Sequence, residues 1–488
     1  MKARISRRDF GRSLGTAAIA SVALQSPASA LPSDQRSSSS SAEGDFPKGF
    51  LWGASTAAYQ VEGGVKEAGR GLSIWDTFSH LPGKTDHGDT GDRADDFLHH
   101  YRSDIQLMSE IGIRAFRFSV SWTRVFPNGG GQPNPNGLDF YRKLVNELQR
   151  VGIQPFCTLY HWDLPQALQD RGGWENPDTA RRMAEYAGYV AGELSRDGVA
   201  HFFTTNEIRT FVELGYGSGS HAPGLQVGRK RLAQLTHNVL LGHGLSVQTI
   251  RARAISGTEV GIAENPTAIV PATLSDADVH AARVAMREEN APYLTAILEG
   301  RYTDRYLAQL GADAPHFTSE EMRIISSPLD AVGLNLYSAT YVRATSSAEG
   351  YEVLSMPADF PHMASFWLAV SPECVAWAPR LVSEIWKPKS LYITENGSSA
   401  DDRLSKMGEV IDLGRVMYLR NCLTHLRRAI AEGVPVRGYF AWSLMDNFEW
   451  ADGYGKRFGL VYVDYSTQKR TPKLSAQFYK SVIAGNAI

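Results

Sequence analysis

This sequence has few cysteines, almost no net charge and no long apolar run. Each of these features argues against a class of protein. The 488 residues contain three cysteines, Cys157, Cys374 and Cys422, an odd number without the spacing of a metal site. We expect buried free thiols, with a single disulfide as the alternative in an exported protein. The formal net charge is −2 without a basic block, which gives no sign of binding to nucleic acid or to a membrane surface.

The N-terminus has the pattern of an export signal. Residues 6–12 read SRRDFGR and precede a modestly apolar run over residues 14–24, followed by Ala28-Ser29-Ala30. A basic start, a short apolar run and small residues before a cleavage point predict a signal peptide over residues 1–30, and the paired arginines resemble a twin-arginine signal. The run is too short to span a membrane. We therefore expect a periplasmic or secreted protein whose mature chain has no membrane anchor.

After a serine-rich segment, residues 31–44, which is predicted to be a disordered linker, one pattern repeats along the chain. A short apolar run ends in polar residues and is followed by a helix-like stretch. The runs cover residues 50–60, 113–122, 153–162, 201–207, 260–265, 331–337, 391–396 and 438–447. Stretches between them, such as LDFYRKLVNELQRVG, have apolar residues at helical spacing and end in glycine, which is typical of a helix C-cap.

Apolar strands that alternate with helices predict a parallel sheet covered by helices. Eight such units predict an α/β fold, a single (β/α)8 TIM barrel over residues 45–488, with the active site at the C-terminal ends of the strands. A doubly wound open sheet is the alternative. That fold is expected to carry a glycine-rich phosphate loop after an early strand, and GGVKEAGRG lacks the required glycine spacing.

Two glutamates at predicted strand ends are candidate catalytic residues. Glu207 ends the fourth apolar run and Glu395 the seventh, and each lies beside an asparagine. These positions face each other across the mouth of an eight-stranded ring. A single glutamate at a strand end is commonly a structural or surface charge. A facing pair is what glycoside hydrolysis needs, since one carboxyl group protonates the leaving oxygen while the other, ionised, attacks or activates water.

Seven sequence blocks resemble the family-one glycoside hydrolases, the β-glucosidase family. They are FLWGASTAAYQVEG, FRFSVSWTRVFP, TLYHWDLP, TTNE, GLNLY, YITENG and AWSLMDNFEW. The blocks appear in the family's order and cover about residues 46–480. The chain thus resembles a bacterial retaining β-glycosidase, most closely a β-glucosidase, which acts by double displacement on a small-molecule glycoside and needs neither a metal nor a cofactor.

The resemblance implies a role for each matching residue. Glu395 matches the nucleophile and Glu207 the general acid/base, while Arg117, Tyr337 and Asn335 match residues that support catalysis. A cation and a phenol hydroxyl beside Glu395 favour its ionised form. The residues matched to the substrate are Gln60, His161, Asn206, Trp442, Glu449, Trp450 and Phe458, with Trp377 matched to the aglycone.

The chain departs from the family after the acid/base. The family has Asn-Glu-Pro, whereas Glu207 is followed here by Ile208 and Arg209. Because a β-branched residue prefers an extended backbone, we expect Ile208 to preserve the geometry of Glu207. Arg209 stands near the leaving-group site of the family and is expected either to line the aglycone site or to form a surface ion pair.

Four other functions are weighed against that of a β-glucosidase. A transglycosylase uses the same covalent intermediate, and a sugar-binding protein without activity would have lost a carboxylate that this chain retains. A thioglucosidase has glutamine in place of Glu207. Family members that act on 6-phospho-glycosides have serine in place of Glu449 and tyrosine in place of Phe458, so unphosphorylated glycosides are expected. Glucose, galactose and fucose all stay open as the sugar, and we expect His80, His87, His99 and His100 to be surface residues.

Overall fold

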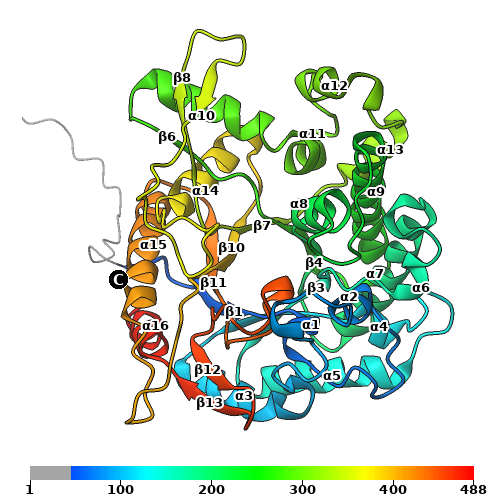
Figure 1. Ribbon diagram of the computed structural model, residues 1–488, viewed down its shortest axis with the longest axis vertical. Coiled ribbons are helices and arrows are strands. Elements are labelled where there is room, and N and C mark those ends of the chain that lie inside the picture. Colours follow the sequence, from blue (N-terminus) through cyan, green and yellow to red (C-terminus); the bar gives the residue numbers. More distant parts are fainter. Residues whose placement is uncertain (1–44) are drawn as a thin grey trace, which may run out of the picture. The chain divides into compact units, whose positions relative to one another are not determined.

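The computed structural model describes residues 45–488, so the predicted signal peptide (1–30) and linker (31–44) lie outside the described residues. Eight parallel strands close into a barrel in which each strand pairs with the next and the last pairs with the first (Figure 1). The strands are β1 (Leu51–Ser55), β2 (Ala115–Ser119), β3 (Gln154–Tyr160), β4 (His201–Asn206), β5 (Glu259–Glu264), β7 (Ala331–Asn335), β10 (Leu391–Asn396) and β11 (Val436–Trp442). Each expected run contains or overlaps one strand. The predicted TIM barrel is therefore confirmed, and closure excludes the open sheet.

Helices cover the outside of the barrel (Figure 1). The longer ones are α3 (Phe97–Ile111), α5 (Pro135–Arg150), α7 (Asp178–Arg196), α9 (Arg229–Arg253), α10 (Asp276–Glu288), α14 (Cys374–Trp386), α15 (Leu413–Ala431) and α16 (Leu474–Gly485). In α5, Leu138, Tyr141, Leu144 and Leu148 are buried at intervals of three and four residues, which places them on one face. The helix ends before Gly152, whose φ of +76° suits glycine.

Side chains fill the interior of the barrel on the side away from the carboxyl ends of its strands. Phe156 packs against Phe440 and Tyr392, with ring centroids 5.0 and 5.5 Å apart, and Phe203 joins the same buried cluster. A Cβ atom at Gly53 would lie 2.4 Å from Phe440 Cδ1, so β1 has room only for glycine at this position beside the ring. The barrel therefore has a packed core, and the open space for a ligand lies toward the carboxyl ends of its strands.

The segments that connect the barrel strands and the longer helices contain short helices and two small sheets. The short helices are α1 (Ala58–Val61), α2 (Ile74–Ser79), α4 (Trp122–Val125), α6 (Gln166–Gln169), α8 (Ile208–Val212), α11 (Ala296–Glu299), α12 (Asp304–Leu310) and α13 (Ser319–Ile325). Two small sheets consist of β6 (Ile269–Pro271), β8 (Thr340–Ala344) and β9 (Tyr351–Val353), and of β12 (Val461–Asp464) and β13 (Lys469–Pro472). Several of the connections between these elements supply residues of the site described below.

The cysteine and histidine side chains noted in the sequence can now be placed. Cys157, Cys374 and Cys422 are buried free thiols. The four histidines noted in the sequence are exposed or partly exposed. Among residues 45–488, no group of three or more His, Cys, Asp or Glu side chains is arranged to hold a metal ion. In the same residues, no helix combines the length and the apolar character that crossing a membrane requires.

Candidate active site

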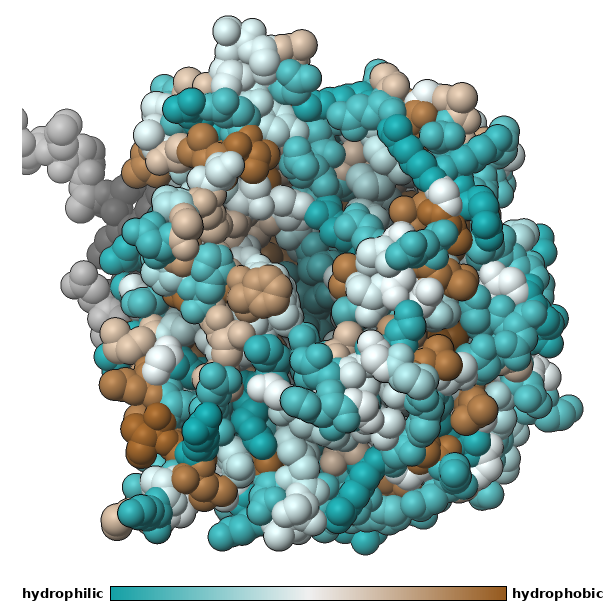
Figure 2. Space-filling view, viewed as in Figure 1, coloured by the Kyte–Doolittle hydropathy of each residue, from teal (hydrophilic) through white to brown (hydrophobic). Residues whose placement is uncertain are grey.

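A pocket of about 550 Å³ opens at the carboxyl ends of the barrel strands. Figure 2 shows a hollow near the centre of the molecular face that looks toward the reader. The residues that line the pocket are His161, Trp162, Asn206, Glu207, Thr210, Leu214, His221, Asn265, Tyr337, Trp367, Leu368, Glu395, Trp442, Glu449, Trp450, Ala451, Asp452 and Phe458. Aromatic and carboxylate side chains predominate, a combination that suits the apolar faces and the hydroxyl groups of a sugar.

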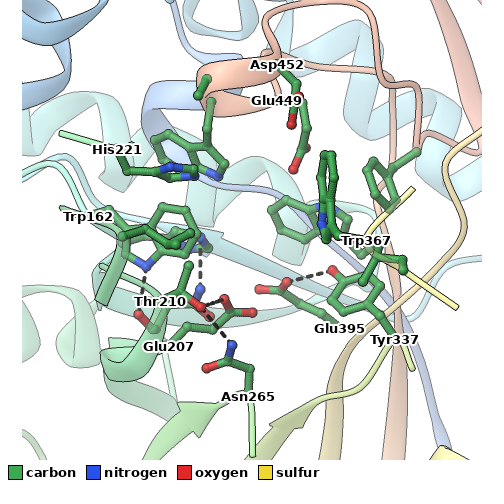
Figure 3. A pocket seen from close by; sticks show the side chains of 18 residues that line it. Trp162, Glu207, Thr210, His221, Asn265, Tyr337, Trp367, Glu395, Glu449 and Asp452 are labelled. Carbon is green, nitrogen blue, oxygen red and sulfur yellow. Dashed lines mark hydrogen bonds between the residues drawn. The ribbon is translucent and has the colours of Figure 1, made fainter. Parts of the chain in front are cut away.

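Glu395, near the end of β10, is held by two donors. Arg117 Nη1 donates to its Oε1 over 2.6 Å. The hydroxyl group of Tyr337 donates to its Oε2 over 2.8 Å (Figure 3). Burial raises the pKa of Glu395 above its ordinary value, and Arg117, Tyr337 and Asn335 offset part of that rise. Because both carboxylate oxygens accept hydrogen bonds, the ionised form is stabilised and its orientation is restricted.

Glu207 follows β4 directly and faces Glu395. Its Oε1 accepts a hydrogen bond from Asn335 Nδ2 over 2.8 Å and its Oε2 one from Thr210 Oγ1 over 2.9 Å. Burial, followed by the charge of Glu395, raises the pKa of Glu207 to about 7. Figure 3 shows the two carboxyl groups pointing toward one another across the pocket. One carboxyl group thus retains a proton near neutral pH beside a second group that has a cation as its partner.

Buried polar side chains connect the two carboxyl groups from behind. Asn206 Oδ1 accepts from Arg117 Nη2 over 2.6 Å and from Asn335 Nδ2 over 3.0 Å. Asn206 Nδ2 lies 3.0 Å from His161 Nε2. Burial and the charge of Arg117 hold the pKa of His161 well below its ordinary value, so the imidazole is neutral and its Nε2 accepts the amide hydrogen. The network fixes the distance and orientation of Glu207 relative to Glu395.

Most of the predicted site residues meet in this pocket. Those that line it are His161, Asn206, Glu207, Tyr337, Glu395, Trp442, Glu449, Trp450 and Phe458. Arg117 and Asn335 are buried behind the two glutamates, as supporting residues must be. Gln60 is also buried behind the pocket wall, where its Nε2 donates to the Phe448 carbonyl over 2.9 Å and lies 3.4 Å from Glu449 Oε2. Gln60 therefore holds the segment that carries Glu449 and is not part of the pocket lining.

Trp377, matched to the aglycone in the sequence, does not line the pocket. Trp377 lies inside helix α14, partly buried against the hydrophobic core, and the Arg380 guanidinium carbon lies 4.7 Å from its ring centroid. The tryptophan that lines the pocket is Trp367, which is 48% exposed and precedes the helix. Residues 374–386 have an apolar helical face, and burial of that face against the barrel directs Trp377 away from the site.

The two residues after Glu207 also differ from expectation. Glu207 has a left-handed backbone (φ 49°, ψ 68°), and Ile208 is the first residue of α8, so neither is extended. The sharp turn from β4 into α8 imposes this conformation. Arg209 does not line the pocket: its guanidinium donates to the Glu289 carbonyl over 2.7 Å and lies over the ring of Tyr293. Arg209 ties α8 to the segment that follows α10, which contradicts an aglycone contact.

Other lining residues escaped the sequence analysis. His221 and Trp367 lie in connections outside the helices and strands, whereas Leu214 lies in the π-helix Glu213–Ser218 and Asp452 in the short 3-10 helix Trp450–Asp452. None of them belongs to an apolar pattern long enough to mark it in the sequence. Burial lowers the pKa of His221 to about 4, which keeps its imidazole neutral. Burial and the neighbouring Asp86 raise the pKa of Asp452 to about 6. These side chains lie in the pocket together with Trp162, which directly follows the predicted residue His161 (Figure 3).

Glu449 is the third carboxyl group of the inner pocket. Burial raises its pKa well above the ordinary value, and the charges of Asp452, Glu395 and Glu207 add to the shift. Trp450, directly after it, has a φ of +51°, and Trp162, which follows β3, has a φ of +77°. Bulky residues seldom adopt a backbone with positive φ. Where such strained conformations occur, they are concentrated at functional sites. The packing of Trp162 against Trp450, at a centroid distance of 4.6 Å, holds both.

Comparisons with known proteins agree with this geometry. The family model described as "Glycosyl hydrolase family 1" matches residues 42–488. A 1,4-β-D-glucan glucohydrolase of Thermotoga neapolitana is 43% identical over 444 residues, which are 91% of this chain and 99% of that protein. The β-glucosidase A of Thermotoga maritima is 42% identical over 91% of this chain and 98% of its own.

Solved structures give the same result. The family 1 β-glucosidase from Thermotoga maritima superposes with a TM-score of 0.84 at 40% identity, covering 92% of this chain and all of that chain. The same enzyme in complex with deoxynojirimycin also has a TM-score of 0.84, at 40% identity over 91% of this chain and all of that chain.

Proposed function

Because the chain belongs to glycosyl hydrolase family 1, we infer that it is a retaining β-glucosidase, which removes terminal β-D-glucosyl residues by double displacement. The observation that carries this inference is the facing pair of buried carboxyl groups with opposite environments. Glu395 accepts hydrogen bonds from Arg117 and Tyr337, whereas burial beside Glu395 raises the pKa of Glu207 to about 7. Two carboxyl groups with such different environments can take the two roles of glycoside hydrolysis.

In the first step, Glu395 attacks the anomeric carbon while Glu207 donates its proton to the leaving oxygen. The glycosidic bond breaks, a glycosyl ester forms on Glu395, and the aglycone departs as an alcohol. In the second step, the ionised Glu207 takes a proton from water, whose oxygen attacks the anomeric carbon and releases Glu395. Two inversions leave the anomeric configuration unchanged.

Arg117, Tyr337 and Asn335 support these steps by electrostatics and orientation. The Arg117 guanidinium and the Tyr337 hydroxyl keep Glu395 ionised until it attacks. Asn335 donates to Glu207 and accepts from Thr394 Oγ1 over 2.7 Å, so its own orientation is fixed. These contacts preorganise the pocket for the developing charge, which costs no rearrangement during the reaction.

The sugar is bound by the inner part of the pocket. Trp442 and His161 lie with their ring centroids 5.9 Å apart and nearly parallel, which offers apolar surface to the C–H groups of a pyranose. Glu449 supplies a carboxyl group for hydroxyl groups of the sugar, and Asn206 an amide beside Glu207. Trp367, at 48% exposure, is placed to contact the aglycone.

Product stereochemistry tests the mechanism. Proton NMR of an aryl β-glucoside digest should show β-glucose as the first product, and α-glucose as the first product would contradict it. Glu207→Ala should slow alkyl glucosides by about 10² to 10⁴ and slow the first step on dinitrophenyl glucosides far less, since only the poor leaving groups need a proton. Equal losses on both substrates would contradict the role of Glu207.

Transglycosylation uses the same intermediate and competes with hydrolysis when an alcohol or a sugar occupies the place of water. Product analysis across a range of acceptor concentrations measures the balance. Hydrolysis is the function that we propose, because the relatives named above are a glucohydrolase and β-glucosidases.

We also propose that this is a bacterial enzyme exported by a twin-arginine signal over residues 1–30, with a linker over 31–44 before the barrel at 45–488. The support is the sequence SRRDFGR ahead of the short apolar run. Replacing both Arg7 and Arg8 by lysine should leave the enzyme in the cytoplasm of a bacterial host. Unchanged activity in the periplasmic fraction would reject the signal.

A further inference from the structure

Glu264, the last residue of β5, is a buried carboxyl group that the steps above do not use. It is 1% exposed. Its Oε1 accepts the backbone N–H of Ile208 over 2.9 Å. Ile208 follows Glu207 directly, is fully buried, and begins α8. The first N–H groups of a helix have no partner within the helix, so Glu264 supplies the acceptor for the one that lies next to the acid/base.

The end of β5 holds the acid/base segment at successive points. The carbonyl group before Glu264 accepts the N–H of Glu207 over 2.8 Å. Glu264 itself accepts the N–H of Ile208. Asn265 Nδ2 donates to Thr210 Oγ1 over 2.7 Å, and that hydroxyl donates to Glu207 Oε2 (Figure 3). The unusual left-handed backbone of Glu207 is thereby fixed on both sides by contacts with one strand.

We propose that Glu264 is a positioning residue for the acid/base: its carboxyl group anchors the backbone directly after Glu207, and its protonation is coupled to that of Glu207. This inference rests on the proposed role of Glu207. Glu264 does not touch the substrate pocket and acts only through its neighbour. Glutamine at position 264 can replace the first of these two actions but not the second, which makes them separable.

The coupling follows from burial and proximity. Burial raises the pKa of Glu264 to about 8, the Ile208 N–H lowers it, and the charge of Glu207 raises it. The other charged groups that face the pair are Arg209 of α8, Glu395 of β10 and Arg117 of β2. Glu264 is hydrogen bonded to the residue directly after Glu207, so the two buried carboxyl groups lie close together and a charge on either one disfavours ionisation of the other. Once Glu264 ionises, its charge opposes further loss of protons from Glu207.

The experiment compares four variants with the wild-type enzyme on a poor leaving group, methyl β-glucoside. In Glu264→Gln, the amide oxygen still accepts the Ile208 N–H, so kcat at pH 6 should stay within about threefold of the wild type. The fall of kcat/KM at alkaline pH should occur over a narrower pH range and about half a unit lower, because Glu264 no longer titrates together with Glu207. An alkaline limb that superimposes on that of the wild type would overturn the proposed coupling between Glu264 and Glu207.

A double-mutant cycle tests the anchor. Glu264→Leu leaves the Ile208 N–H buried without an acceptor and should lower kcat about tenfold. Ile208→Pro removes that N–H at the first helical position, which accepts proline, and leaves the Glu264 carboxyl group without its donor. The double variant Glu264→Leu/Ile208→Pro lacks both groups and should recover to within about threefold of the wild type. A double variant no more active than Glu264→Leu would overturn the proposal.

The same data distinguish failure of this proposal from failure of the proposed function. If Glu207 is the acid, the alkaline limb of the wild-type enzyme is strong on methyl β-glucoside and weak on dinitrophenyl β-glucoside. An equal limb on both substrates means that the role of Glu207 is wrong. A normal contrast between the substrates, with a Glu264→Gln profile identical to that of the wild type, means that only the coupling to Glu264 is wrong.

Discussion

Tyr337→Phe removes the hydroxyl group that donates a hydrogen bond to the nucleophile, Glu395, and leaves the rest of the side chain in place. The hydroxyl donates to Glu395 Oε2 over 2.8 Å, and the ring stays in place because it packs edge-on against Phe458 at a centroid distance of 6.0 Å. After the change, Glu395 Oε2 loses its tyrosine donor, while Arg117 still binds Oε1. The variant therefore isolates the contribution of a single hydrogen bond to the reactivity of the nucleophile.

The size of the effect follows from the charge and burial of the acceptor. A hydrogen bond to a charged group contributes about 1.5–3 kcal/mol, which corresponds to about a tenfold to 150-fold change in rate. Because Arg117 still neutralises Glu395, we expect the lower end, a loss of about tenfold in kcat/KM. Loss of the donor also raises the pKa of Glu395. At a given acid pH fewer molecules then carry the ionised nucleophile, so the acid limb of the profile moves to higher pH.

The assay is kcat/KM for an aryl β-glucoside between pH 4 and pH 9, with Tyr293→Phe as the matched control. Like Tyr337, Tyr293 donates to a glutamate, in its case Glu213 over 2.9 Å, but it is buried and does not line the pocket. The control should keep the acid limb of the wild type. A Tyr337→Phe variant with an unchanged acid limb and a kcat/KM within twofold of the wild type would refute the reasoning.

Three further predictions concern the rest of the pocket. Glu395→Ala should abolish turnover, and azide should restore it with an activated aryl glucoside, giving a glycosyl azide of inverted configuration by NMR. Trp367→Ala should lower kcat/KM for aryl glycosides by up to about tenfold, from the loss of about 0.5–1.5 kcal/mol of stacking, whereas Trp377→Ala should lower the melting temperature and leave relative rates among aglycones unchanged. The enzyme should hydrolyse plain β-glucosides and not their 6-phosphates, because Glu449 offers an acid and Phe458 no hydroxyl group where a phosphate dianion needs donors; comparable kcat/KM on both forms would contradict this.

The contacts around Ile208 show how a local rule can be misapplied. The β-branched side chain predicts an extended backbone at position 208, yet Ile208 starts a helix and Glu207 is left-handed. The deciding partners are Glu264, the last residue of β5, and Asn265, directly after it. They are 56 and 55 residues away in sequence from the groups that they bind. Backbone preferences of a few tenths of a kcal/mol cannot compete with a buried N–H that needs an acceptor.

The barrel and its two glutamates were determined by the sequence alone, because both depend on local pattern. Apolar runs of strand length that end in polar residues predict parallel strands with a shared functional end, and Glu207 and Glu395 stand at two of those ends. The positions of Trp367 and Trp377 were decided only by the tertiary structure. Trp367 lies in a connection without periodicity, and its place depends on the loops that pack around it. Trp377 belongs to α14, whose apolar face is buried against the barrel. Burial of apolar surface stabilises the fold, whereas a tryptophan exposed at the mouth of the pocket would not, so Trp377 packs with the core.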